Sequence, residues 1–217
     1  MKRRAIVNLV TNSERYIKGQ QRLINSFNTH FDGSCELVTF VGEYSVNSEL
    51  HIHNPYSFKV GAIEMLRSRF DQILWLDASM VFVKPMKPIF DLIEKNGFFL
   101  EDSGWKIGTW TNDFALNYFG ITRDDAMQMR MFSSGFTGID FTTEIGCSFF
   151  DLWKKSMLAG CFKGTWQEHR HDQTCGSIIA NQLGMDKMYS EGGTYFSYIG
   201  EAYGEPKETA ICHLIGV

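Results

Sequence analysis

Short apolar runs alternate with amphipathic segments through the first half of the chain, and this alternation constrains the fold more than any other feature. Residues 5–11, 36–42 and 73–76 are short and rich in β-branched and other apolar side chains, as strands are. Between them, residues 15–27 and 58–70 carry apolar side chains at helical spacing. Strand–helix–strand alternation predicts right-handed βαβ units, and therefore a single α/β domain whose central sheet is mixed, mostly parallel and flanked by helices.

The second half of the chain is less regular. Phe82-Val83 and the Pro85/Pro88 pair are expected to lead into a helix at 89–96. After it come a tryptophan-containing loop at 103–112, a helix at 113–119, a strand at 136–140 (FTGID), a helix at 143–158, a helix after Asp172 and a last strand at 210–215.

Composition excludes several classes of protein. The chain has 21 Lys and Arg against 25 Asp and Glu, and no basic run exceeds Lys2-Arg3-Arg4, so nucleic acid is not an expected partner. Its 18 Phe, 8 Tyr and 5 Trp exceed what a disordered chain carries. Five cysteines without C-x-x-C spacing favour neither a disulfide framework nor a zinc knuckle, so a cytoplasmic location is expected. No apolar run reaches the roughly 18 residues of a membrane span.

Polar residues follow two of the predicted strands, where ligands of such sheets bind. These are Thr11-Asn12 and Asp77-Ala78-Ser79, and neither stretch carries a dinucleotide or P-loop fingerprint. A carboxylate directly after four apolar residues needs a partner if it is buried. Asp77 is therefore either a ligand of a divalent cation that also binds phosphate oxygens, or a cap of the next turn.

His213 lies in the apolar run ICHLIG near the end of the chain. It is either a satisfied core residue or a metal ligand. Together with Asp77, its imidazole would suit Mn²⁺ or Mg²⁺, provided that diphosphate oxygens and water complete the octahedron. Lys59, in the first turn of a predicted helix, either reaches a phosphate at the same sheet edge or is a solvated surface lysine.

Two further features leave other functions open. The sequence His169-Arg170-His171-Asp172 could be a fragment of a metal-dependent hydrolase site, or Asp172 could simply open a helix. Three tryptophans lie in polar, glycine-containing segments and could either stack on sugars or cover the core. If they stack on sugars, the protein could also be a non-catalytic sugar- or nucleotide-binding module. They are Trp105, Trp110 and Trp166.

In this order, the segments resemble the GT-A class of nucleotide-sugar glycosyltransferases, whose fold is Rossmann-like, over nearly the whole chain. The motifs that carry the resemblance are AIVNLVTN, FKVGAIEML, ILWLDAS, SSGFTGIDF, HDQT and ICHLIG. Within the class, the chain is most similar to the small capsid-glycosylating domain of large algal DNA viruses (chloroviruses) and, more distantly, to glycogenin-like enzymes. A viral origin would place the protein in the host cytoplasm.

The resemblance assigns roles to individual residues. Asp77 matches the first Asp of the D-x-D motif, Ser79 stands at the second and departs from it, and His213 matches a C-terminal metal-binding His. Asp172 matches the catalytic acid near the transferred sugar. The donor would contact Thr11, Asn12, Arg15, Tyr16, Lys59, Asp77, Ala78 and Ser79, and the acceptor side would hold Trp105, Trp110, Ser134, Gly135, Trp166 and His171.

The implied activity is a metal-dependent transfer of a sugar from a UDP-sugar to a glycan or glycoprotein acceptor. Retention of anomeric configuration is favoured because glycogenin-like enzymes retain. Residues 1–100 would form the nucleotide-sugar-binding half, and 101–217 the acceptor-side half with a C-terminal metal-binding strand. The small size is compatible with one domain of a larger glycosyltransferase.

Overall fold

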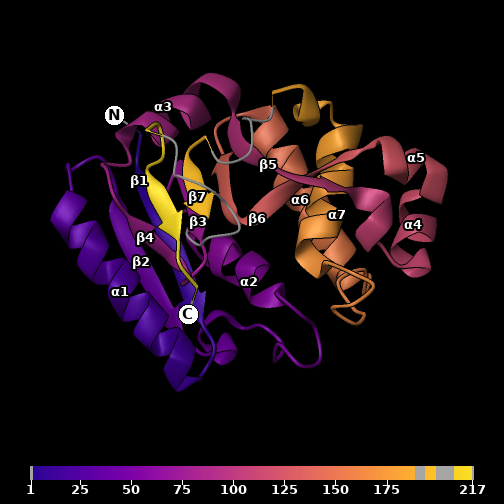
Figure 1. Ribbon diagram of the computed structural model, residues 1–217, viewed down its shortest axis with the longest axis horizontal. Coiled ribbons are helices and arrows are strands. Elements are labelled where there is room, and N and C mark those ends of the chain that lie inside the picture. Colours follow the sequence, from indigo (N-terminus) through magenta and orange to yellow (C-terminus); the bar gives the residue numbers. More distant parts are fainter. Residues whose placement is uncertain (1, 189–193, 199–207, 217) are drawn as a thin grey trace.

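The computed structural model describes residues 2–188, 194–198 and 208–216 (Figure 1). Its main sheet has the order β2-β1-β3-β6-β5. The strands are β1 Arg4–Val10, β2 Glu36–Val41, β3 Gln72–Leu76, β5 Phe98–Lys106 and β6 Arg130–Asp140. β1 pairs in parallel with β2 and β3, whereas β6 is antiparallel to both β3 and β5, so β6 alone runs against the others. The predicted α/β class with a mixed, mostly parallel sheet is confirmed.

A second, smaller sheet lies beside the main one. It contains β4 Met80–Phe82, β7 Phe196–Tyr198 and β8 Cys212–Leu214. β8 is central, antiparallel to β4 and parallel to β7. The predicted last strand therefore exists, and it places His213 opposite Val81 of β4.

Helices cover both faces of the main sheet (Figure 1). Ile6 and Leu74 pack with side chains of α1 (Glu14–His30) and α3 (Lys87–Asn96). Val7 and Trp75, one residue further along each strand, pack with the opposite layer. That layer contains α2 Ser57–Leu66, α6 Glu144–Leu158 and α7 His171–Gln182. Because side chains alternate along a strand, two largely apolar strands supply both cores.

The second half of the chain differs from its predicted elements in detail. Residues predicted as a tryptophan-containing loop begin inside strand β5, which places Trp105 on a strand; only Ile107–Trp110 form a 3₁₀ turn (η2). FTGID is the last part of the longer β6. The prediction failed because the β5–β6 pairing shifts register twice, and such irregularities disrupt the alternation of apolar residues.

Short helical segments complete the fold. They are α4 Asp113–Phe119, α5 Arg123–Gln128, and the 3₁₀ turns η1 Glu43–Val46 and η3 Met185–Met188. The sequence interpretation missed α5, although Thr122 and Asp125 form a capping box that marks its start. The predicted division after residue 100 falls within β5, so both halves share one sheet. No helix in the described ranges is both long and apolar enough to cross a membrane.

Candidate active site at the carboxyl edge of the sheet

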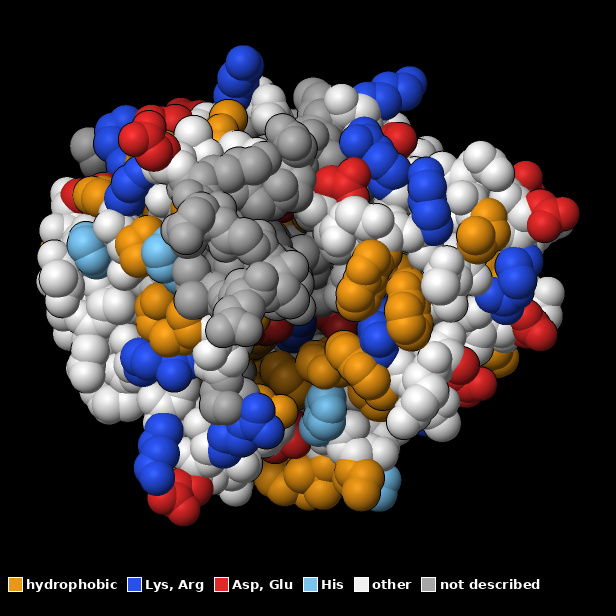
Figure 2. All heavy atoms as spheres, in the orientation of Figure 1, with side chains coloured by type: hydrophobic (Ala, Val, Ile, Leu, Met, Phe, Trp, Pro, Cys, Tyr) orange, Lys and Arg blue, Asp and Glu red, His pale blue; other side chains and the backbone are white. Residues whose placement is uncertain are grey.

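A cavity of about 230 Å³ opens where β1 and β3 end. β1 and β3 are parallel neighbours, so their carboxyl ends meet at one edge, as expected for a ligand site in this kind of sheet. Its lining comprises Leu9, Val10, Thr11, Tyr16, His51, Tyr56, Phe58, Asp77, Ala78 and Ser79. On the face drawn in Figure 2, hydrophobic side chains lie below and to the right of a hollow near the centre, and charged side chains are visible inside it.

Three of the predicted donor contacts, Asn12, Arg15 and Lys59, do not line this cavity. A Cβ added at Gly42 would lie 3.2 Å from Nδ2 of Asn12, so the Asn12 side chain packs at the end of β2. Arg15 is exposed in the first turn of α1. Their contact with a nucleotide stays a prediction.

Lys59 is buried between two carboxylates. Its side chain is 1% exposed, and Nζ lies 3.0 Å from Oδ2 of Asp172 and 3.3 Å from Oδ1 of Asp77. Nζ also donates hydrogen bonds to the carbonyl and the hydroxyl of Ser134. Burial alone would lower the pKa of Lys59, but Asp172 and Asp77 raise it above its ordinary value. The alternative of a solvated surface lysine is therefore wrong.

Asp77 is held by the neighbouring strand as well as by Lys59. Its backbone N–H donates to the carbonyl of Gly135 at 2.9 Å, and the indole N–H of Trp75 donates to Oδ1 at 2.7 Å. A Cβ at Gly135 would come within 2.8 Å of Oδ2, so only glycine leaves room for this carboxylate. The Asp77 side chain is 37% exposed, and a ligand in the cavity can reach it.

Asp172 lies in the first turn of α7 and is 2% exposed. The helix N-terminus stabilises a negative charge at this position. Trp153 donates from its indole N–H to the Asp172 carbonyl at 2.9 Å and fixes the start of the helix. Oδ2 is paired with Lys59 by charge, yet it accepts no hydrogen bond of regular geometry within the described residues. This oxygen has spare capacity to accept a hydrogen bond, but it is buried, and Asp172 is not among the residues that line the cavity.

The predicted metal ligands are only partly assembled. Ile215 donates its backbone N–H to the carbonyl of Ser79 at 3.0 Å, which holds β8 beside the end of the Asp77 loop. Burial lowers the pKa of His213, and the nearby Lys84 cation adds to this shift. Within the described ranges, no three or more His, Cys, Asp or Glu side chains form a group that could hold a metal. An ion here would thus depend on Asp77, at most one imidazole, and ligand oxygens.

The predicted acceptor-side tryptophans gather around one cation. The guanidinium carbon of Arg170 lies 3.9 Å from the ring centre of Trp166, 4.0 Å from that of Trp110 and 5.4 Å from that of Trp105. Trp166 also stacks on His171 at 5.8 Å. We call Arg170 and its three tryptophans the tryptophan cage. Sequence analysis found the tryptophans but missed Arg170, although it stands beside the singled-out His and Asp residues.

The His169–His171 segment is used structurally. His169 is fully buried; Nε2 bonds the Cys161 carbonyl at 2.8 Å, and Nδ1 accepts from the Asn112 N–H at 3.3 Å. Nδ1 of His171 bonds the Phe162 carbonyl at 2.8 Å. These bonds leave His169 without a free ring nitrogen, and the described residues contain no group of three or more His, Cys, Asp or Glu side chains that could hold a metal. The observation behind the hydrolase alternative is thereby removed.

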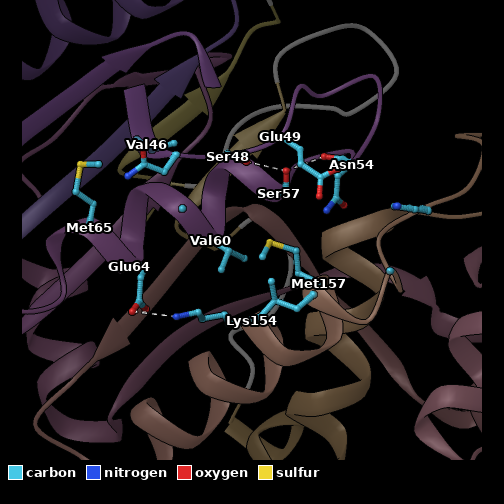
Figure 3. A pocket seen from close by; sticks show the side chains of 15 residues that line it. Val46, Ser48, Glu49, Asn54, Ser57, Val60, Glu64, Met65, Lys154 and Met157 are labelled. Atoms are coloured by element: carbon cyan, nitrogen blue, oxygen red, sulfur yellow. Dashed lines mark hydrogen bonds and ion pairs between the residues drawn. The ribbon is translucent and has the colours of Figure 1, made fainter. Parts of the chain in front are cut away.

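A second, larger cavity of about 410 Å³ lies between η1, α2 and α6 (Figure 3). An ion pair of Glu64 with Lys154, at 3.0 Å, and a hydrogen bond between Ser48 and Ser57, at 2.8 Å, cross its lining. None of the predicted site residues lines it.

Comparisons with known proteins agree with this fold. No protein-family model matches the chain. No curated protein sequence matches it either. The apo structure of the bifunctional glycosyltransferase WbbM is similar, with a TM-score of 0.63 and 12% identity over 98% of this chain, which spans 45% of that one. Apo mouse xyloside xylosyltransferase 1 gives a TM-score of 0.58 and 9% identity over 97% of this chain and 96% of that one.

These similarities define the class of fold. Both structures are of glycosyltransferases, and the chain shares their α/β architecture, as the resemblance to the GT-A class predicted. The present chain spans less than half the length of the WbbM structure. Neither structure bears on the narrower likeness to algal-virus and glycogenin-like enzymes, which stays a prediction.

Proposed function

We propose that this protein is a glycosyltransferase that moves a sugar from a nucleoside-diphosphate sugar, with a UDP-sugar preferred, to a hydroxyl of a glycan or glycoprotein. The observation that carries the proposal is the buried Lys59, which joins Asp77 on the cavity wall to Asp172 at the start of α7. This arrangement places a fixed cation and two carboxylates next to a cavity at the sheet edge. The two similar solved structures, both of glycosyltransferases, support the same class of reaction.

Each residue has a defined part in this reaction. The bond from the sugar C1 to the diphosphate oxygen breaks and its electron pair leaves with the diphosphate. The acceptor oxygen bonds C1, and its hydroxyl proton passes to an oxygen of the departing diphosphate. Lys59 holds the Asp77 and Asp172 carboxylates in place and reduces the negative charge that the departing diphosphate meets. The Asp172 carboxylate opposes the positive charge that develops at C1. Tyr16, 42% exposed on the cavity wall, closes over the base.

The metal requirement belongs to the proposal too. Asp77, with His213 or the Ser79 hydroxyl, would hold Mn²⁺ or Mg²⁺ weakly until a diphosphate supplies the remaining oxygens. A bound divalent ion adds neutralisation of the diphosphate charge. Retention of configuration and transfer to a glycan or glycoprotein remain parts of the proposal that rest on the resemblance.

Ligand-induced stabilisation tests the proposal. We expect UDP, among UDP, GDP, CMP and dTDP, to raise the melting temperature, and to do so far more with Mn²⁺ than without it. At roughly 100-fold saturation, linkage predicts about 2.7 kcal/mol of added stability. Asp77→Asn should remove the Mn²⁺-dependent part, whereas Asp91→Asn, on the surface of α3, should leave it unchanged. Absence of any nucleotide effect would refute a nucleotide-sugar enzyme.

A second measurement separates an enzyme from a binding module. A transferase releases UDP slowly from its UDP-sugar when water replaces the acceptor. We expect such release from the wild type with at least one common UDP-hexose. Tight UDP binding without hydrolysis or transfer of any donor would favour the sugar- or nucleotide-binding module instead.

A further inference from the structure

Arg170 is a buried cation held by aromatic rings. The residue is 7% exposed, and its guanidinium lies about 4 Å from the ring centres of Trp110 and Trp166. Trp105 completes the cage, 5.2 Å from Trp110 between ring centres. Contact with aromatic faces offsets part of the cost of burying the charge. It leaves the in-plane N–H groups, the donors that recognise anions, to be satisfied separately.

No carboxylate of the described residues pairs with this guanidinium. One terminal N–H donates to the carbonyl of Trp166, and the buried Nε–H has no acceptor among the described groups. Asp172, two residues along, pairs with Lys59 instead. The pKa of Arg170 is lowered by burial, a sign that its charge is poorly compensated. Buried charges in proteins are normally paired, so an external anion is the missing partner.

Among the residues that the structure describes, the groups around the cage carry no compensating charge. Burial lowers the pKa of both His169 and His171, so both rings are neutral at pH 7. Burial raises the pKa of Tyr56, whose hydroxyl therefore stays protonated. Glu168 is exposed and makes no ion pair with Arg170. The cage is thus a locally cationic point with apolar walls.

The cage is also placed to contact a sugar ring. Trp105 and Trp166 are 44% and 48% exposed, so indole surface is available for stacking against a pyranose face. Tyr56 joins the cage to the cavity: it lines the cavity, and its ring centre is 6.1 Å from that of Trp166. A ligand in the cage therefore lies next to the cavity that we assign to the donor.

We propose that the tryptophan cage is a subsite for an acidic sugar, in which Arg170 binds the carboxylate of a uronic acid and an exposed indole stacks on its ring. The inference rests on the proposed glycosyl transfer and names its substrate class. The donor diphosphate is the other available anion, but Arg170 does not line the cavity that we assign to the donor, and the cage meets that cavity only through Tyr56. A planar guanidinium suits a carboxylate because two parallel N–H groups bind its two oxygens.

Matched ligands test the subsite directly. Methyl glucuronide and methyl galacturonide are compared with methyl glucoside and methyl galactoside, which differ only at the carboxylate. Binding is followed by tryptophan fluorescence and calorimetry. We expect at least one uronide to bind about tenfold or more tightly than its neutral partner, and this preference to weaken with added salt. Equal affinity for acid and neutral forms in both pairs would overturn the proposal.

Two variants assign the preference to Arg170. R170Q should abolish it while leaving weak binding of the neutral glycosides, and R170K should restore it only in part because an ammonium lacks the planar pair of donors. If both variants unfold, the wild-type affinities and their salt dependence still decide the question. If R170Q weakens UDP binding as much as uronide binding, the cage belongs to the donor phosphates and the proposal fails.

The outcome is separable from that of the proposed function. Uronide binding without any nucleotide effect would leave the subsite in place and refute the transferase. Nucleotide binding and donor hydrolysis without a uronide preference would support the transferase and refute the acidic-sugar subsite.

Discussion

The site region holds two buried cations whose surroundings differ in kind. Lys59 is enclosed by the carboxylates of Asp77 and Asp172, so its charge is neutralised within the protein. Arg170 is enclosed by three tryptophans, and its charge is not neutralised by any described carboxylate. The first arrangement is complete without a ligand and fixes an electrostatic environment. The second is incomplete and leaves N–H donors for an incoming anion.

The two cations also differ in how the fold assembles their partners. Lys59 on α2 meets the end of β3 and the start of α7, three elements from distant parts of the chain. Arg170 instead takes Trp166 from its own segment and the other indoles from β5 and η2. Assembly of the Lys59 ion pairs therefore requires elements from distant parts of the chain to pack correctly, whereas assembly of the tryptophan cage requires only the elements at one end of the sheet.

Removal of the Lys59 charge should have the largest effect. Lys59→Met leaves two carboxylates without their cation, one of them almost fully buried, and we expect the free energy of unfolding to fall by about 3–5 kcal/mol. Denaturant unfolding measures the change. Lys154→Met is the matched control, because Lys154 is 36% exposed in its pair with Glu64 and should cost less than about 1 kcal/mol. Equal losses would mean that the buried cluster carries no special electrostatic cost.

The neutral histidines beside the cage predict a loss of stability in acid. His169 has its pKa lowered by burial to about 4, below the ordinary value of 6.5. Between pH 4 and pH 6.5, His169 binds a proton in the unfolded chain but not in the folded protein. Its contribution to the free energy of unfolding is therefore fully present above pH 6.5 and decreases as the pH falls toward 4. The expected contribution is about 3 kcal/mol.

Unfolding free energies measured from pH 7 to pH 4.5 test this dependence. His169→Gln should flatten the profile, whatever its effect at pH 7. The exposed His53, changed to Gln, should leave the slope as in the wild type. An unchanged slope in His169→Gln would show that His169 is not the group that titrates.

Asp172→Asn should separate catalysis from donor binding. The amide keeps the shape of the carboxylate but loses its charge, and Lys59 still has Asp77 as a partner. We expect kcat for sugar transfer or donor hydrolysis to fall about 100-fold or more, while UDP affinity changes by less than about threefold. The exposed Asp151→Asn serves as the control. Unaltered turnover would reduce Asp172 to a structural acid at a helix start.

The residues of the site that lie at the ends of strands could be predicted from the sequence. Thr11, Asp77 and Ser79 line one cavity because parallel strands end at one sheet edge, and this follows from the alternation of strands and helices. The ion pair of Lys59 with Asp172 could not be predicted, since it requires α2 and α7 to lie on the same face of the sheet. Periodicity also misplaced Trp105, because the bulges in β5 hide the strand that carries it.

Arg170→Met should have the smallest effect on stability. It tests whether the charge of Arg170, unlike that of Lys59, has no partner among the described carboxylates. Methionine keeps contact with the indoles but removes the charge, and no carboxylate of the described residues loses a partner. The loss of cation–π attraction predicts a decrease of about 1–2 kcal/mol in unfolding free energy, well below that of Lys59→Met. A difference between the two variants of less than about 1 kcal/mol would contradict the comparison. Because the charge is costly without an anion, saturating uronide should widen the gap between wild type and Arg170→Met, whereas the neutral glycoside should leave it unchanged.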